Sequence, residues 1–250
     1  MDRPVQPAPI RHNDLRDTMT YSRLAQQLRA TGLLLALLLT IALPARAQIT
    51  IADEDTELPD YTDYYAAVEA MEAGDYATAL TEFTRAAEEE GLHLAQYNLG
   101  VMYYTGQGVE QSYETAFHWL SQAADQGHLN SMFNLATMYY NGQGMNSALM
   151  QVWPLSLISR RQNLQQAAIW YQEAAEYEHA GAQYNLATMY EAGEGVTQDL
   201  TRAYLWARLA RDNEATGAAE LVGRIEAAMT PAQLDQAQRE YAQWVLEFRG

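Results

Sequence analysis

From residue 61 onwards, apolar residues recur three and four positions apart, which predicts amphipathic helices. The pattern is repeated: three segments of similar sequence begin at Ala95, Ser131 and Ala182, with offsets of 36 and 51 residues, the second being 36 plus an insertion of 15. In each segment a small residue, Leu and Met follow at i, i+4 and i+7, which places them on one helical face. These triplets are Ala95, Leu99 and Met102; Ser131, Leu135 and Met138; and Ala182, Leu186 and Met189.

A Gly-x-Gly sequence follows each of these helices and predicts a turn, because glycine both ends helices and adopts backbone angles closed to other residues. A second helix then places Ala116, Trp119 and Ala123 on one face, with equivalents in the later units. Small alanines allow close helix approach while Trp fills the space beside them. Each unit is thus a helix hairpin with an apolar face that it cannot bury alone. Stacked hairpins can bury it, so the sequence predicts an all-α solenoid.

We expect four units, at about 61–91, 92–127, 128–179 and 180–213, followed by a capping helix pair at 214–250. The first unit is divergent and has only Gly74-Asp75 at its turn. The third contains the insertion, at 145–163. Thr230 and Pro231 predict the start of the last helix, as N-cap and first helical residue. The apolar face of that helix consists of Leu234, Ala237, Tyr241, Trp244 and Val245.

The repeated pattern Ala-x-Tyr-Asn-Leu-Gly-x-Met-Tyr-x-x-Gly-x-Gly-Val, followed by Ala-x-x-Trp, resembles Sel1-like repeats, a branch of the tetratricopeptide-like hairpins. The resemblance covers roughly residues 61–213, and the insertion departs from the family pattern. It implies a right-handed α-solenoid and a non-catalytic adaptor role, since bacterial members are often exported and hold other proteins on the concave surface. Two alternatives stay open. The first is an enzyme, either a periplasmic hydrolase of cell-wall or polysaccharide material or a β-lactamase-like member. The second is a structural component of a polysaccharide-secretion assembly.

The first sixty residues differ in kind from the repeats. Several arginines precede an apolar run at 31–43, and Ala45 and Ala47 form a small-x-small cleavage site before Gln48. This predicts a secretory signal peptide at 1–47, with Met19 as an alternative start. Thirteen residues make about 20 Å of helix, which favours cleavage over a membrane anchor lengthened by its flanks. An acidic linker follows at 48–60. We therefore expect a periplasmic or secreted protein without stable membrane insertion after cleavage.

The amino-acid composition limits the classes of partner that the chain can bind. The chain has 32 Asp and Glu, 15 basic residues that are all Arg, no cysteine, and a formal charge of −17. Removal of 1–47 would leave nine Arg against 29 acidic residues, a charge near −20. Such a charge repels nucleic acid, and the missing cysteine excludes disulfides, thiolate metal sites and a lipobox. It also separates the chain from the cysteine-rich Sel1 proteins that have the lactamase activity. The expected protein partner has a basic or neutral face, or an acidic spot that meets Arg.

No motif predicts catalysis, a cofactor or a metal. The Gly-x-Gly turns follow helices, and the chain has no Lys for a phosphate-binding loop, no Gly-x-Ser-x-Gly and no Ser-x-x-Lys. The histidines lack the i, i+3 or i, i+4 pair typical of zinc sites. His128 and His179 share one repeat position, which we interpret as the C-terminal end of each second helix, where a cation suits the helix dipole.

Two sets of residues are candidates for partner contact. Asn98, Asn134 and Asn185 recur inside the first helices, although Asn is a mediocre helix former. Their amides either bond buried backbone groups of the neighbouring turn or contact the backbone of a partner. The insertion combines many apolar residues with Trp153, Arg160 and Arg161. It either docks a partner with Trp153 as the main contact, or folds back along the edge of the solenoid.

Overall fold

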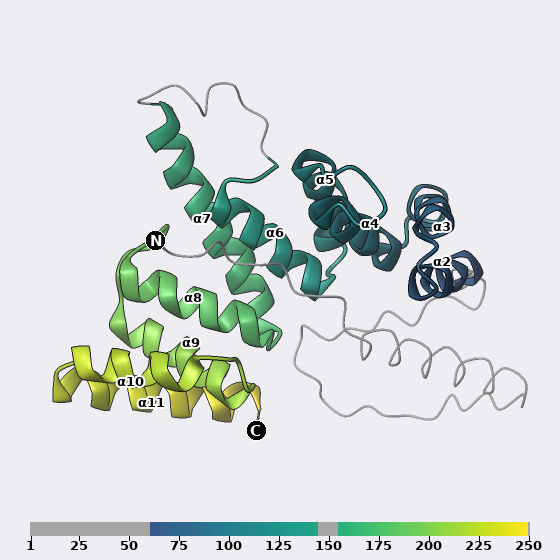
Figure 1. Cartoon of the computed structure of the whole chain (residues 1–250). Helices are drawn as coiled ribbons and strands as arrows, with labels where there is room; N and C mark the ends of the chain where they lie inside the picture. Colours follow the sequence, from purple (N-terminus) through teal and green to yellow (C-terminus); the bar gives the residue numbers. More distant parts are fainter. Residues whose placement is uncertain (1–60, 145–154, 250) are drawn as a thin grey trace, which may run out of the picture. The chain divides into compact units, whose positions relative to one another are not determined.

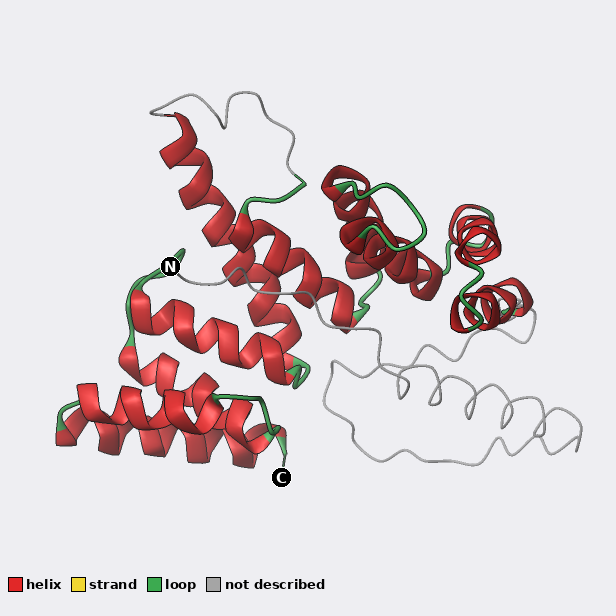
Figure 2. Ribbon diagram, viewed as in Figure 1, coloured by secondary structure: helices red, strands yellow, loops and turns green. Residues whose placement is uncertain are grey.

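The computed structural model describes residues 61–144 and 155–249. Within these ranges the chain forms ten α-helices and no strand (Figures 1 and 2). The predicted signal peptide with Ala45, Ala47 and Gln48, the acidic linker and Trp153 lie outside the described residues. The helices follow one another as five pairs: α2 (Thr62–Glu72) and α3 (Tyr76–Glu88), α4 (His93–Thr105) and α5 (Tyr113–Asp125), α6 (Leu129–Asn141) and α7 (Leu155–Glu176), α8 (Ala180–Ala192) and α9 (Leu200–Asp212), α10 (Ala218–Ala228) and α11 (Pro231–Phe248).

Each of the first four pairs is a hairpin that packs on the next. The two helices within a hairpin contact each other, and α3 contacts α4, α5 contacts α6, and α7 contacts α8. At the C-terminal end both α10 and α11 pack against α9. This serial packing is that of an all-α solenoid, in which each unit buries its apolar face against its neighbours.

The buried core follows the predicted repeat positions. All nine residues of the three predicted triplets are buried, with Leu99, Leu135 and Leu186 among the largest fully enclosed side chains. The alanines predicted on the second helix, Ala116 and Ala123, are fully buried as well. These positions close the interface between the helices of each hairpin, so the spacing rule identified the core correctly.

The two glycines of each turn have different tasks. Gly193 ends α8 in the left-handed conformation with φ 74°, and its N–H bonds to a carbonyl of the last turn. Gly195 also has a positive φ, but it lies directly against the preceding hairpin, where a Cβ would come within 2.3 Å of the Leu164 carbonyl oxygen. Gly108 is equally close to Tyr76. The first glycine thus serves the helix end, and the second allows two hairpins to touch.

The histidine prediction is wrong in its physical reason. His128 and His179 are the N-cap residues of α6 and α8, where the imidazole Nδ1 accepts the backbone N–H of Ser131 and Ala182 at 3.2 and 3.1 Å. An acceptor at this position must be the neutral ring, because a protonated imidazole has no free lone pair. The positive end of the next helix, rather than the negative end of the previous one, therefore sets the role of these residues.

Stability should depend on the charge state of His128. Burial and the neighbouring His93 lower the pKa of His128 from 6.5 to about 4. Because the folded pKa is the lower one, its contribution is complete above pH 6.5 and is lost as the pH falls from 6.5 towards 4. Between pH 7 and 5 we expect a loss of about 2 kcal/mol in unfolding free energy from this group.

Denaturant unfolding at both pH values, compared with His128→Asn, isolates that contribution. Asn caps a helix without titrating, and the carboxylates are common to both proteins. The variant should lose less stability on acidification than the unmodified chain. An equal loss in the two proteins would contradict the capping role of the neutral imidazole.

The predicted insertion is partly helical. α7 has 22 residues where the equivalent helices α5 and α9 have 13, because it begins at Leu155 and includes residues 155–163. Arg160 and Arg161 therefore belong to an N-terminal extension of α7 (Figure 1). Only residues 145–154 of the insertion lie outside the described part of the chain.

The C-terminal helices begin where their residues dictate. α11 starts with Thr230 as N-cap in a capping box with Gln233, and Pro231 is its first residue, which confirms the predicted start. α10 is shorter than expected because Glu214 and Gly217 have φ values of 59° and 81° and form a turn. The predicted apolar face of α11 is confirmed, since Ala237 is buried and Leu234, Tyr241, Trp244 and Val245 pack on the core.

Candidate functional site

The segment 160–165 of α7 and the turn between α8 and α9 border an open pocket of about 1010 Å³. Arg160 and Arg161 line it from α7, and both are exposed. The opposite wall is formed by the segment 193–199, with Arg202 and Tyr190 beside it. The insertion thus adds two cations to a pocket that is otherwise made of repeat residues, and we call this site the arginine pocket.

The carboxylates of the arginine pocket already have partners. Glu194 accepts the hydroxyl of Tyr140 at 2.6 Å. Asp199 is the N-cap of α9 and accepts the backbone N–H groups of Thr201 and Arg202 at 2.9 and 3.1 Å. Glu194 is thus hydrogen-bonded within the fold, and Asp199 has the role that is usual for a carboxylate at a helix N-terminus.

The arginines that line the pocket differ from one another in whether they have a partner within the fold. Arg202 donates to the Tyr190 hydroxyl at 3.1 Å and lies 3.8 Å from Asp199. Arg160 and Arg161 form no ion pair with any carboxylate of residues 61–144 or 155–249. Two guanidinium groups beside a concave surface suit a carboxylate or another anion, which arginine binds through paired N–H donors.

The wall opposite Arg160 and Arg161 is fixed by two contacts. Gln198 donates its Nε2 to the carbonyl of Glu191 at 2.8 Å and thereby ties the turn to the end of α8. Because Gly195 has no side chain, the same turn can lie directly against the Leu164 backbone. The first full repeat uses the same device, in which Gln111 bonds to the Tyr104 carbonyl at 2.7 Å. Sequence reasoning missed these glutamines, although each stands five residues after the first turn glycine.

Asn98 and Asn185 form side-chain hydrogen bonds within a helix or the core and not to the turns. Asn98 is buried and donates to the Leu94 carbonyl of its own helix at 2.9 Å. Asn134 is buried to 1% exposure, and Asn185 is half-buried and hydrogen-bonds to the Tyr171 hydroxyl inside the core. Burial leaves the amides of Asn98 and Asn134 no surface for a partner. The structure thus places the asparagines apart from Arg160 and Arg161, and the predicted bond to the Gly-x-Gly turn is wrong for Asn98.

The described residues also show whether side chains are grouped to bind a metal and whether a helix could span a membrane. Within them, no group of three or more His, Asp or Glu is arranged to hold a metal. No helix among the described ones is both long enough and apolar enough to span a bilayer. The predictions of no catalytic residue and no cofactor stay predictions. What the arginine pocket offers is a charged, concave surface for binding.

A stack of helical hairpins with repeated turn glycines defines a helical-repeat protein, and the comparison with known families identifies the kind. The Sel1 repeat model matches residues 93–128, 129–147, 158–176 and 180–214. The interruption between 147 and 158 coincides with the insertion. The chain is a Sel1-like repeat protein, and Sel1 repeats generally mediate protein–protein interaction and are typically non-catalytic scaffolds.

Two known proteins are similar to this chain. One is the exopolysaccharide production negative regulator of Rhizobium meliloti (strain 1021), which is 29% identical over 195 residues, covering 78% of this chain and 72% of the regulator. The other is the crystal structure of a Sel1 repeat protein from Oxalobacter formigenes, with 28% identity and a TM-score of 0.54. That match covers 64% of this chain and 59% of the other, which is less than two thirds of its length.

Proposed function

We propose that this protein is an exported, non-catalytic scaffold that binds another protein and receives an acidic group of that partner in the arginine pocket. The observation that supports this most is the state of Arg160 and Arg161. In a chain with a net charge of −17, both guanidinium groups line a pocket without an ion pair to the described carboxylates. Their placement on a helical extension specific to one repeat also suits a dedicated contact.

Export is the second part of the proposal and rests on the leader sequence at 1–47. A solenoid without cysteine loses nothing in an oxidising compartment, because it needs no disulfide for stability. The similarity to the exopolysaccharide production negative regulator favours a second, narrower function. In this narrower function, the bound partner takes part in the control of exopolysaccharide production. The identity of the recovered partner distinguishes this narrower function from a general adaptor role.

Charge reversal of the pocket should abolish partner capture. The full chain, tagged and expressed in its own host, is used to recover partners under mild crosslinking, in parallel with R160E/R161E. We expect the variant to lose at least about 90% of the captured partner, because like charges replace attraction in a concave site. Arg239→Glu, on the exposed face of α11, is the matched control and should retain capture.

Equal recovery with all three proteins would show that the arginine pocket does not bind the partner. Circular dichroism of each variant checks that the helical fold is intact. Both pocket residues are exposed, so their substitution should leave the melting temperature within about 2 °C of the unmodified protein.

A further inference from the structure

The first and last full repeats close one edge of the hairpin with a pair of side-chain amides. In the first, Gln126 at the end of α5 donates its Nε2 to Gln96 Oε1 at 2.8 Å and to the Gly91 carbonyl at 3.1 Å. In the last, Asn213 after α9 donates to Gln183 Oε1 at 2.9 Å and to the Glu178 carbonyl at 3.3 Å. We call this arrangement the amide bridge.

The middle repeat has apolar residues at both positions of the bridge. By the repeat offsets of 36 and 51, Met132 stands where Gln96 and Gln183 stand, and Tyr177 stands where Gln126 and Asn213 stand. Neither Met nor Tyr has an amide, so the same edge is built differently in this one unit. Met132 is buried, whereas Tyr177 is 61% exposed.

An open groove replaces the bridge in the middle repeat. Its volume is about 690 Å³, and it lies among the end of α5, the start of α6 and one face of α7. Ile169 and Glu173 stand at i and i+4 on α7, with Trp170 beside them, and Tyr177 continues this spacing just after the helix ends. Ile169 is 57% exposed, so two large apolar side chains of this face meet solvent. We call this site the middle groove.

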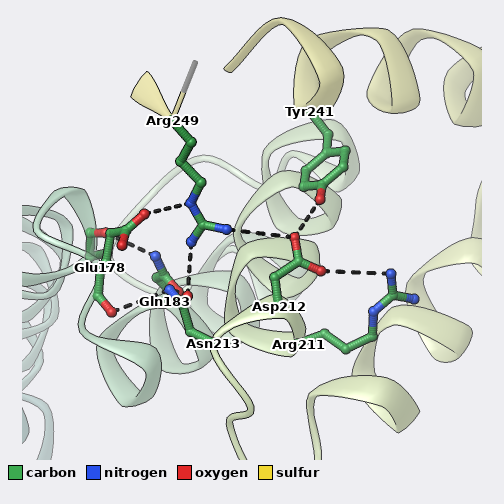
Figure 3. A network of polar contacts seen from close by, with 8 residues as sticks. Glu178, Gln183, Arg211, Asp212, Asn213, Tyr241 and Arg249 are labelled. Carbon is green, nitrogen blue, oxygen red and sulfur yellow. Dashed lines mark hydrogen bonds and ion pairs between the residues drawn. The ribbon is translucent and has the colours of Figure 1, made fainter. Parts of the chain in front are cut away.

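The equivalent face of the last repeat is covered by a helix of the chain itself. Trp206 stands at the position of Trp170, yet it is only 7% exposed, because its ring packs at 6.4 Å from Trp244 of α11. Arg249, five residues after Trp244, donates to Asn213 Oδ1 at 2.8 Å and forms an ion pair with Glu178 (Figure 3). An aromatic residue followed by arginine thus covers this face in the last repeat.

The middle groove has the matching chemistry but no helix of the described chain over it. Its apolar floor of Met132, Trp170 and Ile169 is bordered by Asp125 and Glu173. Neither carboxylate forms an ion pair with a described cation. Asp125 comes from the end of the preceding hairpin, as Glu178 does in the last repeat. The groove is therefore complementary to an apolar side chain next to a positive charge.

We propose that the middle groove binds an amphipathic helix of a partner protein, through an aromatic side chain on Met132 and Ile169 and a following Lys or Arg that meets Asp125 or Glu173. This inference rests on the proposed function and names a second contact, separate from the arginine pocket. Helix-in-groove binding of this kind depends on one large buried side chain and gains orientation from the flanking charges.

The test uses a probe that the chain itself supplies. A fluorescein-labelled peptide of residues 230–249 contains the capping box, Trp244 and Arg249, and its binding to the full chain is measured by fluorescence anisotropy. We expect saturable binding at one site. Two control peptides, one with Trp244→Ala and one with Arg249→Glu, should each bind at least about tenfold more weakly.

The decisive protein variant is M132Q/Y177N, which gives the middle repeat the amide pair of the last one. Because that pair exists at the same positions of a sister repeat, the variant should fold and melt at or above the temperature of the unmodified protein. It should lose at least about tenfold in affinity for the peptide. Glu173→Arg, a surface change, should weaken binding as well, and Gln172→Ala, exposed on α7 outside the groove, should not.

Three results would overturn the inference. The first is no peptide binding to the unmodified chain. The second is equal binding by M132Q/Y177N, which would mean that the peptide exchanges with α11 on the last repeat. The third is concentration-dependent dimerisation of the full chain that M132Q/Y177N abolishes, which would make a second copy the occupant. If the peptide fails while R160E/R161E still loses the captured partner, the middle groove proposal falls and the proposed function stands.

Discussion

Replacing Trp206 by Ala should lower the free energy of unfolding by about 3–5 kcal/mol, the usual cost of removing a buried Trp side chain. Trp206 is 7% exposed and lies between the core of the last hairpin and α11, where its ring meets Trp244. Its loss leaves a cavity on one side and removes the main contact of the capping helix on the other. Guanidinium chloride unfolding, followed by circular dichroism, measures the change.

Trp119→Ala is the matched control, because Trp119 has the same position in the first full repeat. There the side chain is half-buried, and no described helix covers the face as α11 does in the last repeat. We expect a loss of about 1 kcal/mol, in proportion to the smaller apolar area. Equal losses for the two variants would mean that α11 does not stabilise the last repeat through Trp206.

Gly195→Ala should cost about 2–5 kcal/mol for two separate reasons. A non-glycine residue at φ 70° costs about 1–2 kcal/mol. The added Cβ would also meet the Leu164 carbonyl oxygen at 2.3 Å, and backbone cannot move aside as a flexible side chain can, so overpacking adds about 1–3 kcal/mol. Thermal and denaturant unfolding of the variant give the total.

Gly142→Ala separates the two costs. Gly142 has a φ of 69°, but a Cβ there would meet nothing within 4 Å. Only the conformational cost applies, so we expect a loss of about 1–2 kcal/mol. If Gly142→Ala proves as damaging as Gly195→Ala, the close approach of neighbouring hairpins is not the reason for the second turn glycine.

The fold was predictable because its information is local and repeated. The spacing of Ala95, Leu99 and Met102 follows directly from 3.6 residues per turn, and three copies of it removed the ambiguity of a single short pattern. The start of α11 was equally local, since Thr230 and Pro231 act within one helical turn. The sequence therefore specified the units, the turns and most of the core.

Side-chain partners were harder to predict because they depend on which of several neighbours lies nearest in space. The position of His128 between two helices allows either a dipole contact behind it or a cap ahead of it, and only the orientation of the ring decides. The asparagine in the helix was a conspicuous sequence feature, whereas the polar ties of the turns are made by Gln111 and Gln198. A polar residue is conspicuous in the interior of an otherwise apolar helix, whereas a glutamine in a turn is not.

The middle groove could not be found from one repeat alone. Position 132 lies on α6 and position 177 just after the end of α7, and the insertion of 15 residues lengthens their separation in sequence. The sequence indicates the groove only through a comparison of the repeats. Both bridge positions carry side-chain amides in the first and last full repeats, whereas the middle repeat has Met and Tyr there. Arg160 and Arg161 were easier to select from the sequence, because they are the only adjacent cations of residues 48–250, whereas the pocket that they line became visible only in the fold.

We propose above all that this solenoid works by binding a protein rather than by catalysis. The decisive measurement is affinity recovery of the full chain from an extract of its own host, with mass spectrometry of the eluate. We expect a single protein partner at a stable stoichiometry, lost with R160E/R161E. Turnover of a glycan or a lactam by the purified protein, with no partner recovered in amounts comparable to the bait, would contradict a role in protein binding alone.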